Sequence, residues 1–148
     1  MPVETEMRVD EVLLSSKTNP LFIEVPLLVN TYDIDVAGHV NNIVYVRWLE
    51  DMRNILFMQI YPMEKLLESN HHLVVVSSEI KYRKQIKLFD KPVGKMFVQS
   101  YSHGMFVLKA EIKIEDYLAF IATQKCVLLN LNENKMFPGN INDLVERD

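Results

Sequence analysis

One long helical pattern dominates this chain and limits the folds that it can adopt. Residues 43 to about 60 carry apolar side chains three and four positions apart, which is the period of an α-helix. Two apolar stripes run along this segment, Val40, Val44, Trp48, Met52 and Ile55 on one and Tyr45, Leu49, Met52, Leu56 and Ile60 on the other. The polar side is narrow and consists of Arg47, Glu50, Asp51 and Arg53. Because so much of its surface is apolar, this helix needs cover from several directions.

The cover comes from segments with the apolar and β-branched pattern of strands. We expect strands at residues 21–29, 72–88, 95–103, 105–115 and 117–131. In the longest one, Val74, Val76, Ser78, Ile80 and Tyr82 alternate with Leu73, Val75, Ser77, Glu79 and Lys81. Pro26 places the first strand at an edge or a bulge. His103 with Gly104, and Glu115 with Asp116, are turn signals, and such short connections imply antiparallel neighbours.

Shorter features complete the expected organisation. Pro62 ends the long helix, and a second short helix covers residues 63–69. A polar tail occupies residues 1–19, and a last helical turn is expected at residues 141–146. The prediction is an α+β fold in which a curved antiparallel sheet of about five strands wraps around one long central helix. This single domain spans residues 20–148.

Composition narrows the range of functions. The net charge of -4 over 148 residues argues against nucleic acid as the main partner. No apolar run approaches the roughly 20 residues of a membrane span, and the N-terminus lacks the apolar core of a signal peptide. Cys126 is the single cysteine, so an internal disulfide and a cysteine-based zinc site are excluded. We expect a soluble cytoplasmic protein without a metal site.

The densest group of chemically useful side chains lies just before the long helix. Asp33, Asp35, Gly38, His39, Asn41 and Asn42 occupy one polar loop, and Asn41 or Asn42 is expected to cap the helix. A helix start offers unpaired backbone N–H groups and a partial positive charge. A carboxylate, an imidazole and a helix start in one segment are the parts that acyl-transfer chemistry needs.

The motif in this region resembles a known family. Residues 32–42, Tyr-Asp-Ile-Asp-Val-Ala-Gly-His-Val-Asn-Asn, are followed by Tyr45 and by Leu-Glu-Asp-Met-Arg at residues 49–53. This pattern is similar to that of the hotdog-fold acyl-CoA thioesterases of the 4-hydroxybenzoyl-CoA thioesterase superfamily, over roughly residues 20–138. The resemblance implies hydrolysis of thioesters of coenzyme A or acyl carrier protein, with no separate cofactor. It also implies a homodimer or homotetramer with active sites between subunits.

The resemblance also implies roles for individual residues. Asp35 matches the essential carboxylate, acting as nucleophile or general base, and the backbone N–H of Asn42 polarises the thioester carbonyl. His39 completes the expected catalytic set, whereas Asp33 is expected to hold the loop by hydrogen bonds to backbone N–H groups. The expected substrate-binding residues are Gly38, Val40, Tyr45, Ser78, Arg83 and Lys84. Compared with plant acyl-carrier-protein thioesterases, Ala37 replaces an Asn and Gln85 stands where an acid would be.

Other assignments remain open at this stage. Lys81, Arg83, Lys84 and Lys87 form a cationic cluster on one predicted strand that either binds coenzyme A phosphates or is a solvated face. Glu79 is the alternative carboxylate if Asp35 is structural. A hotdog hydratase or dehydratase, or a non-catalytic acyl-thioester-binding module, is the competing function.

Overall fold

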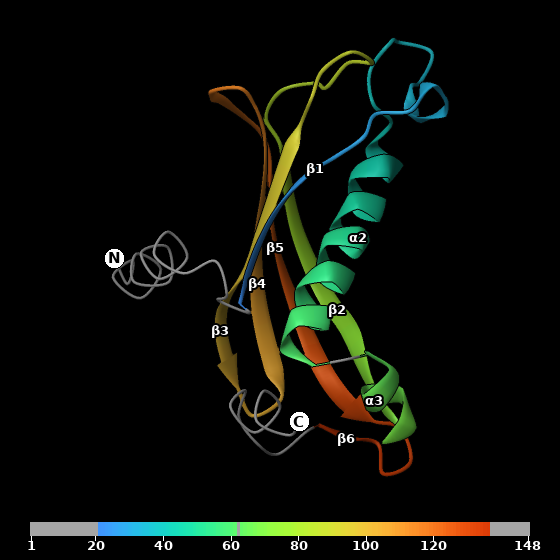
Figure 1. The fold of residues 1–148 in the computed structure, drawn as a ribbon, viewed down its shortest axis with the longest axis vertical. Helices are drawn as coiled ribbons and strands as arrows, with labels where there is room; N and C mark the ends of the chain where they lie inside the picture. Colours follow the sequence, from blue (N-terminus) through green and yellow to red (C-terminus); the bar gives the residue numbers. More distant parts are fainter. Residues whose placement is uncertain (1–20, 62, 137–148) are drawn as a thin grey trace.

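The computed structural model describes residues 21–61 and 63–136, and it shows one curled sheet with a long helix against it (Figure 1). In chain order the elements are β1 (Phe22–Pro26), η1 (Thr31–Asp33), α2 (Asn42–Ile60), α3 (Met63–Glu68), β2 (His71–Tyr82), β3 (Val93–Ser102), β4 (Met105–Ile114), β5 (Tyr117–Asn130) and β6 (Lys135–Met136). The predicted tail at residues 1–19, Pro62 and the predicted turn at residues 141–146 lie outside the described residues. The helices at 43–60 and 63–69 are confirmed within one residue.

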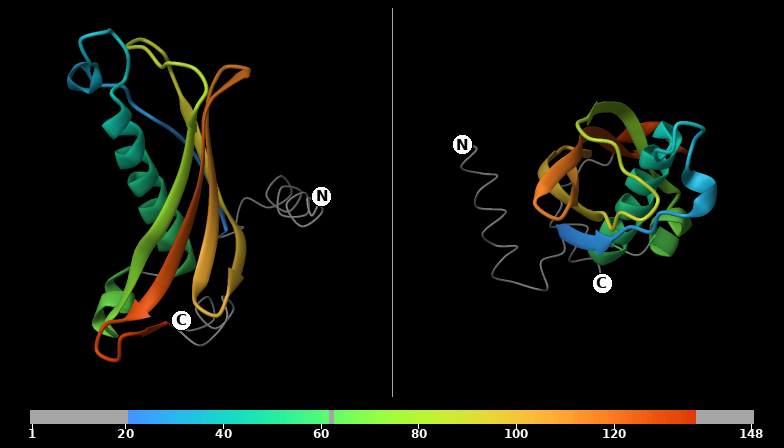
Figure 2. Two further views of the ribbon diagram at one scale, coloured as in Figure 1. Left: turned by 180° about the vertical axis from the view of Figure 1, so that it is seen from behind. Right: turned by 90° about the horizontal axis from the view of Figure 1, so that it is seen from above.

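All strand pairs are antiparallel, and the sheet has the order β1-β3-β4-β5-β2, with β6 added to β5. Figure 2 shows α2 inside the curve of this sheet when the molecule is seen from above. The predicted α+β architecture, a curved sheet around one central helix, is therefore confirmed. Pro26 pairs with Val93 at the end of β1, which is an edge strand as its proline predicts.

The core lies between α2 and the concave face of the sheet. Leu49, Met52 and Leu56 are fully buried on the helix, and each such side chain stabilises the fold by about 1.5–3 kcal/mol relative to exposure. The sheet contributes the alternate residues of β4, Phe106, Leu108, Ala110, Ile112 and Ile114, as their period of two predicts. Two helix positions differ from expectation: Ile55 is exposed, and Arg53 turns toward the sheet.

The predicted faces of β2 are wrong in its first half because the strand contains a β-bulge. The pairing with β5 shifts between Val75 and Ser77, so one extra residue enters the strand there. Leu73 and Val75 pack against the core before the bulge, and Ile80 packs against it afterwards. Val74 and Val76 consequently remain exposed.

The predicted strand at residues 72–88 also ends too late. β2 stops at Tyr82, where the next two backbone N–H groups, of Arg83 and Lys84, both donate to the carbonyl oxygen of Ala119 (2.8 and 3.0 Å). Two donors on one acceptor end the regular ladder, and the chain leaves the sheet. Residues 83–92 then cross the start of α2, with Ile86 fully buried. The cationic residues that follow Tyr82 therefore lie on a loop and not on a strand.

The tight connections follow their sequence signals. His103 and Gly104 both have positive φ, 51° and 84°, which matches the hairpin turn between β3 and β4. Glu115, with φ 54°, does the same between β4 and β5. The short strand β6 lies beyond the last strand predicted from sequence, which ends at residue 131.

Candidate active site

Asp35 is held in a tight loop between β1 and α2 by hydrogen bonds through one carboxylate oxygen. Its Oδ1 accepts the backbone N–H of Ala37 (2.9 Å) and of His39 (3.2 Å). Its main chain pairs with the same loop, since its N–H donates to the carbonyl oxygen of His39 (2.8 Å). Oδ2 accepts no hydrogen bond from the described residues, and the side chain is exposed. The carboxylate is therefore fixed by one oxygen and available through the other.

Gly38 closes this loop in a conformation that favours glycine. Its φ is +85°, and its N–H donates to the carbonyl oxygen of Asp35 (3.0 Å). A Cβ built on Gly38 would meet no atom within 4 Å, so space does not require a glycine here. The left-handed backbone does, because a Cβ there costs roughly 1–2 kcal/mol.

The start of α2 leaves a backbone donor open to solvent. Asn41 is the N-cap, and its Oδ1 accepts the N–H of Ile43 (3.1 Å), which confirms one of the two predicted caps. The N–H of Val44 donates to the carbonyl oxygen of Asn41 (2.9 Å). The N–H of Asn42 has no acceptor among the described residues. Such a donor, with the helix dipole behind it, can stabilise an oxyanion.

Further hydrogen bonds hold the loop and the helix start together. Asp33 is buried, and its Oδ2 accepts the backbone N–H of Asn30 (2.8 Å) and its side-chain amide (3.3 Å). Its carbonyl oxygen accepts the N–H of Asn41 (2.8 Å). On the other side, the N–H of Val40 donates to the carbonyl oxygen of Ile86 (2.8 Å). Asp33 thus has the loop-holding geometry expected from sequence.

A hollow of about 910 Å³ collects these groups on the β2 side of the helix start. It is lined by Asp35, Ala37, His39, Val40, Asn42, Tyr45, Tyr82, Arg83, Lys84, Gln85, Lys87, Asp90 and Tyr117. Tyr45 forms part of its wall and contacts the rings of Tyr82 (5.1 Å between centroids) and Phe120 (4.9 Å). Burial raises the pKa of the Tyr45 hydroxyl, against a smaller lowering by a hydrogen bond with the Ile86 backbone. Tyr45 is therefore neutral at physiological pH.

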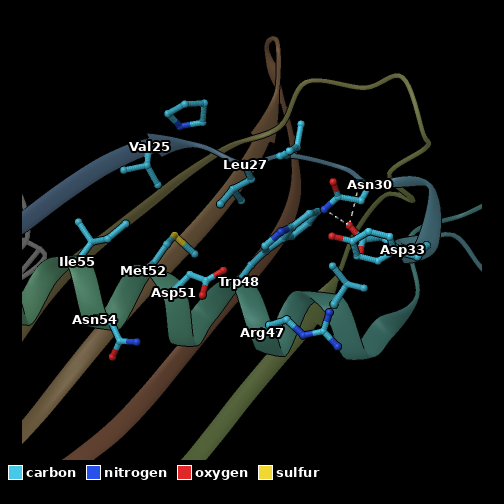
Figure 3. A pocket seen from close by; sticks show the side chains of 14 residues that line it. Val25, Leu27, Asn30, Asp33, Arg47, Trp48, Asp51, Met52, Asn54 and Ile55 are labelled. Atoms are coloured by element: carbon cyan, nitrogen blue, oxygen red, sulfur yellow. Dashed lines mark hydrogen bonds between the residues drawn. The ribbon is translucent and has the colours of Figure 1, made fainter.

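A second hollow, of about 540 Å³, lies on the opposite side of α2, under the segment that follows β1. Figure 3 shows Val25, Leu27, Trp48 and Met52 around its floor, with Arg47, Asp51 and Asn54 along the helix. Two carboxylates line it, that of Asp51 and that of Asp33, which already accepts two hydrogen bonds from Asn30 (Figure 3). Asn42 does not line this hollow, so among the described hollows the one beside Asp35 is where a carboxylate and the open helix-start donor occur together.

A comparison with protein families shows which family the chain matches. Residues 29–142 match the thioesterase-like superfamily, which is more than three quarters of the chain. The chain belongs to the thioesterase-like superfamily. The hotdog-thioesterase resemblance seen in the sequence is thereby confirmed. Curated protein sequences contain no match to this chain.

Solved structures of thioesterases have the same fold. The DHNA-CoA thioesterase of Staphylococcus aureus has a TM-score of 0.72 at 18% identity, over 79% of this chain and 80% of its own. A thioesterase of Thermus thermophilus complexed with coenzyme A and zinc has a TM-score of 0.71 at 24% identity, over 83% and 96%. The probable thioesterase YbaW of Escherichia coli has a TM-score of 0.65 at 21% identity, over 84% and 92%. At these identities the likeness shows the fold.

In this thioesterase-like chain, the structure brings most of the predicted site residues to one hollow. The predicted catalytic residues Asp35, His39 and Asn42 all line it, as do Val40, Tyr45, Arg83 and Lys84 from the predicted substrate-binding set. His39 is partly exposed, and its ring makes no hydrogen bond with the described residues. The Lys84 ammonium lies over the Tyr117 ring, 4.7 Å from its centre.

Three predicted residues lie elsewhere. Gly38 shapes the loop without lining the hollow, and Ser78 lies further along β2. Glu79, the alternative carboxylate, is also outside the hollow. It alternates with Ser78, whose Oγ accepts a hydrogen bond from a concave-face residue, so Glu79 lies on the outer face.

Sequence reasoning did not assign Tyr82, Asp90 or Tyr117 to the site, although all three line the hollow. Asp90 folds residues 83–92 locally, since its Oδ2 accepts the N–H of Lys87 (2.8 Å). Its position just after the predicted strand at residues 72–88 was the only signal. Tyr117 begins β5, next to the point where β2 ends, and only the strand pairing places it here.

Other chemistries find no support in the described ranges. Burial raises the pKa of the Cys126 thiol to about 11, against a smaller lowering by the nearby Arg53 charge, so this cysteine is a protonated core residue. In residues 21–61 and 63–136, His, Cys, Asp and Glu nowhere form a group of three that could hold a metal ion. None of the helices in this part of the chain has the length and apolarity to cross a membrane.

Proposed function

We propose that this protein hydrolyses acyl thioesters of coenzyme A, with Asp35 as its essential carboxylate. The observation that carries the proposal is the shared hollow of Asp35 and Asn42, where one offers a free carboxylate oxygen and the other a free backbone N–H. Membership in the thioesterase-like superfamily supports thioester hydrolysis. The coenzyme A complex of the Thermus thermophilus thioesterase supports the carrier.

The proposed reaction uses Asp35 as a general base. Oδ2 takes a proton from a water molecule whose oxygen attacks the thioester carbonyl carbon. The Asn42 N–H and the positive end of α2 stabilise the oxyanion that forms. When the tetrahedral intermediate collapses, the C–S bond breaks, the thiolate takes the proton, and the free acid leaves. His39 hydrogen-bonds the attacking water or the acyl oxygen.

The cationic side chains beside the hollow can bind the phosphates of coenzyme A. Arg83, Lys84 and Lys87 all line it and are exposed. Residues 83–92 carry these cationic side chains past the start of α2. The phosphates of coenzyme A can therefore lie outside the hollow while the thioester reaches Asp35. Lysine and arginine suit phosphates through charge-assisted hydrogen bonds.

We further propose that two chains associate through β2. This strand ends the sheet order, so one edge has no strand partner among the described residues, and Val74 and Val76 are exposed on it. An exposed apolar edge favours pairing with another strand. The hollow beside Tyr82 would then lie next to the subunit interface, as the family resemblance implies.

The test is release of free thiol from short, long and aromatic acyl-CoAs. We expect turnover by wild type and a fall in kcat of about 10²–10⁴-fold in Asp35→Asn, the contribution of a general base. Asp51→Asn is the matched control, an exposed acid on the far side of α2. If Asp35→Asn were as active as wild type, the Asp35 carboxylate would have no essential role in the mechanism. Incorporation of oxygen-18 from water into the Asp35 carboxylate after a single turnover would show that Asp35 acts as a nucleophile and not as a general base.

The competing functions predict different results with the same reagents. An acyl-carrier-protein thioesterase would release thiol only from carrier-protein substrates. A hydratase would add water to an enoyl thioester without releasing thiol. A binding module would retain acyl-CoA without any turnover.

A further inference from the structure

A chain of hydrogen bonds crosses the inside of the sheet about three turns along α2 from its start. Nη1 of Arg53 donates to Oε1 of Gln124 on β5 (2.8 Å), and Nε2 of Gln124 donates to Oγ of Ser78 on β2 (2.9 Å). Gln124 is only 3% exposed, in an otherwise apolar core. Such a buried amide needs both partners, so its orientation is fixed.

The direction of these bonds follows from the groups involved. A guanidinium only donates, so the Gln124 oxygen has to face Arg53 and its amide nitrogen has to face Ser78. Ser78 Oγ therefore accepts, and its own hydrogen remains available to donate elsewhere. The buried glutamine thus holds a guanidinium and a hydroxyl donor close together, at the side of α2 that faces β2.

The donors of Arg53 are mostly unused within the described residues. A guanidinium has five N–H groups, and Arg53 makes the bond to Gln124 without an ion pair to any described carboxylate. Glu50, one turn earlier on the helix, is exposed and forms no ion pair with it. Arg53 is itself partly buried and lies close enough to the buried Cys126 to lower the thiol pKa. A partly desolvated cation with free donors favours a bound carboxylate.

The stretch of α2 and β2 between this pair and the active site is the path that an acyl chain would take to reach Arg53. Tyr45 and Tyr82 are in contact at one end, and Arg53 and Ser78 are joined through Gln124 at the other. The two ends are about 12 Å apart along the helix and about 13 Å apart along the strand. The two elements therefore run alongside each other over this distance.

Two apolar side chains on this path are incompletely covered, and the exposed Glu50 lies beside it, one turn before Arg53. Val46, one turn after the helix start and two turns before Arg53, is 48% exposed. Ile80 is partly buried between Ser78 and Tyr82 on the concave face of β2. α2 lies closer to β1 and β3 than to β2.

We propose that Arg53 and Ser78 are specificity-determining residues that bind a carboxylate at the far end of the acyl group. The preferred substrates are then thioesters of ω-carboxyacyl chains. This inference rests on the proposed thioesterase function. The Asn42 N–H and Arg53 are 11 residues apart on one helix, about 16 Å, so a chain extended between them is a medium or long one.

The kinetic test compares two acyl-CoA series that differ only at the chain end. We expect wild type to hydrolyse ω-carboxyacyl-CoA with kcat/KM at least about tenfold above that for the methyl-ended chain of equal length, since one hydrogen bond to a charged group has that effect. Arg53→Met should abolish the preference by raising KM for the carboxylated series alone. Arg53→Lys should keep part of it, and Ser78→Ala should lower it by a smaller factor.

Arg47→Met is the matched control, because Arg47 lies on the same helix but lines the hollow on the β1 side. It should leave the preference unchanged. Equal kcat/KM for both series in wild type would overturn the proposal. An Arg53→Met variant that keeps the preference would also overturn it. If that variant also loses its assembly in sedimentation, Arg53 serves the contact with a second copy of the chain.

A binding measurement separates this inference from the proposed chemistry. Titration calorimetry of Asp35→Asn with ω-carboxyacyl-CoA and methyl-ended acyl-CoA of equal length requires no turnover. Tighter binding of the ω-carboxyacyl-CoA, lost on adding Arg53→Met, would support the pair even if no thioester were hydrolysed. Equal binding of both thioesters would reject the carboxylate site while leaving the thioesterase function intact.

Discussion

The backbone N–H of Val40 donates to the carbonyl oxygen of Ile86 at 2.8 Å, and this bond joins two segments that are distant in sequence. Val40 lies between His39 and the helix cap, and Ile86 lies in the loop that carries the cations beside the hollow. Both side chains are buried. The carboxylate loop and the proposed phosphate-binding loop are therefore one packed unit.

This unit predicts a stability effect at Ile86. Ile86→Ala removes a fully buried side chain, so we expect the free energy of unfolding to fall by about 2–5 kcal/mol. Urea denaturation measures it. Phe89→Ala, in the same loop but 89% exposed, is the control and should change stability by about 0.5 kcal/mol or less. Equal effects of the two variants would mean that the loop is not packed on the helix start.

A second prediction tests whether backbone conformation or lack of space requires a glycine at Gly38. Gly38→Ala should lower the free energy of unfolding by about 1–2 kcal/mol, because φ is +85° although a methyl group would meet no neighbour. Gly38→Asn should lose less, since asparagine tolerates this region better. Denaturation of the three proteins measures the order. An alanine variant as stable as wild type would show that the loop readily adopts another conformation.

The parts that were predictable from sequence are those set by local pattern. The helix from Asn42 follows from its apolar stripes and cap, and the buried face of β4 follows from five alternating residues. The gathering of Asp35, His39 and Asn42 follows from their closeness in one loop before the helix. In these places the local period and the tertiary packing agree.

The sequence-based predictions that were wrong concern features that depend on contacts between segments distant in the sequence. The bulge between Val75 and Ser77 has no signal in a run of valines and serines, and it reverses which face is buried. The end of β2 depends on Ala119, whose carbonyl takes two donors from the chain after Tyr82. Arg53 fits a polar helix side by its charge, and only the position of Gln124 on β5 shows that it turns inward.

Cys126 predicts a dependence of stability on alkaline pH. Its thiol pKa rises from 9.0 to about 11 on folding, so between these values the native state keeps a proton that the unfolded state has lost. The stabilisation is complete below pH 9 and is lost as pH rises through about 11. The loss approaches about 1.4 kcal/mol per pH unit at most. Cys126→Ala should show a constant offset from wild type below pH 9 that narrows above it. An offset that stays constant to pH 11 would contradict the buried thiol.

Substitutions at the helix cap can distinguish the roles of the adjacent Asn41 and Asn42. Asn41→Ala should lower the free energy of unfolding by about 0.5–2 kcal/mol, because its Oδ1 accepts the N–H of Ile43. Asn42→Ala should change it by less than about 0.5 kcal/mol, since that exposed side chain makes no capping bond. Thiol release should persist in Asn42→Ala, because the proposed oxyanion donor is the backbone N–H, which alanine retains. A loss of kcat in Asn42→Ala with unchanged stability would move the role from the backbone to the side-chain amide.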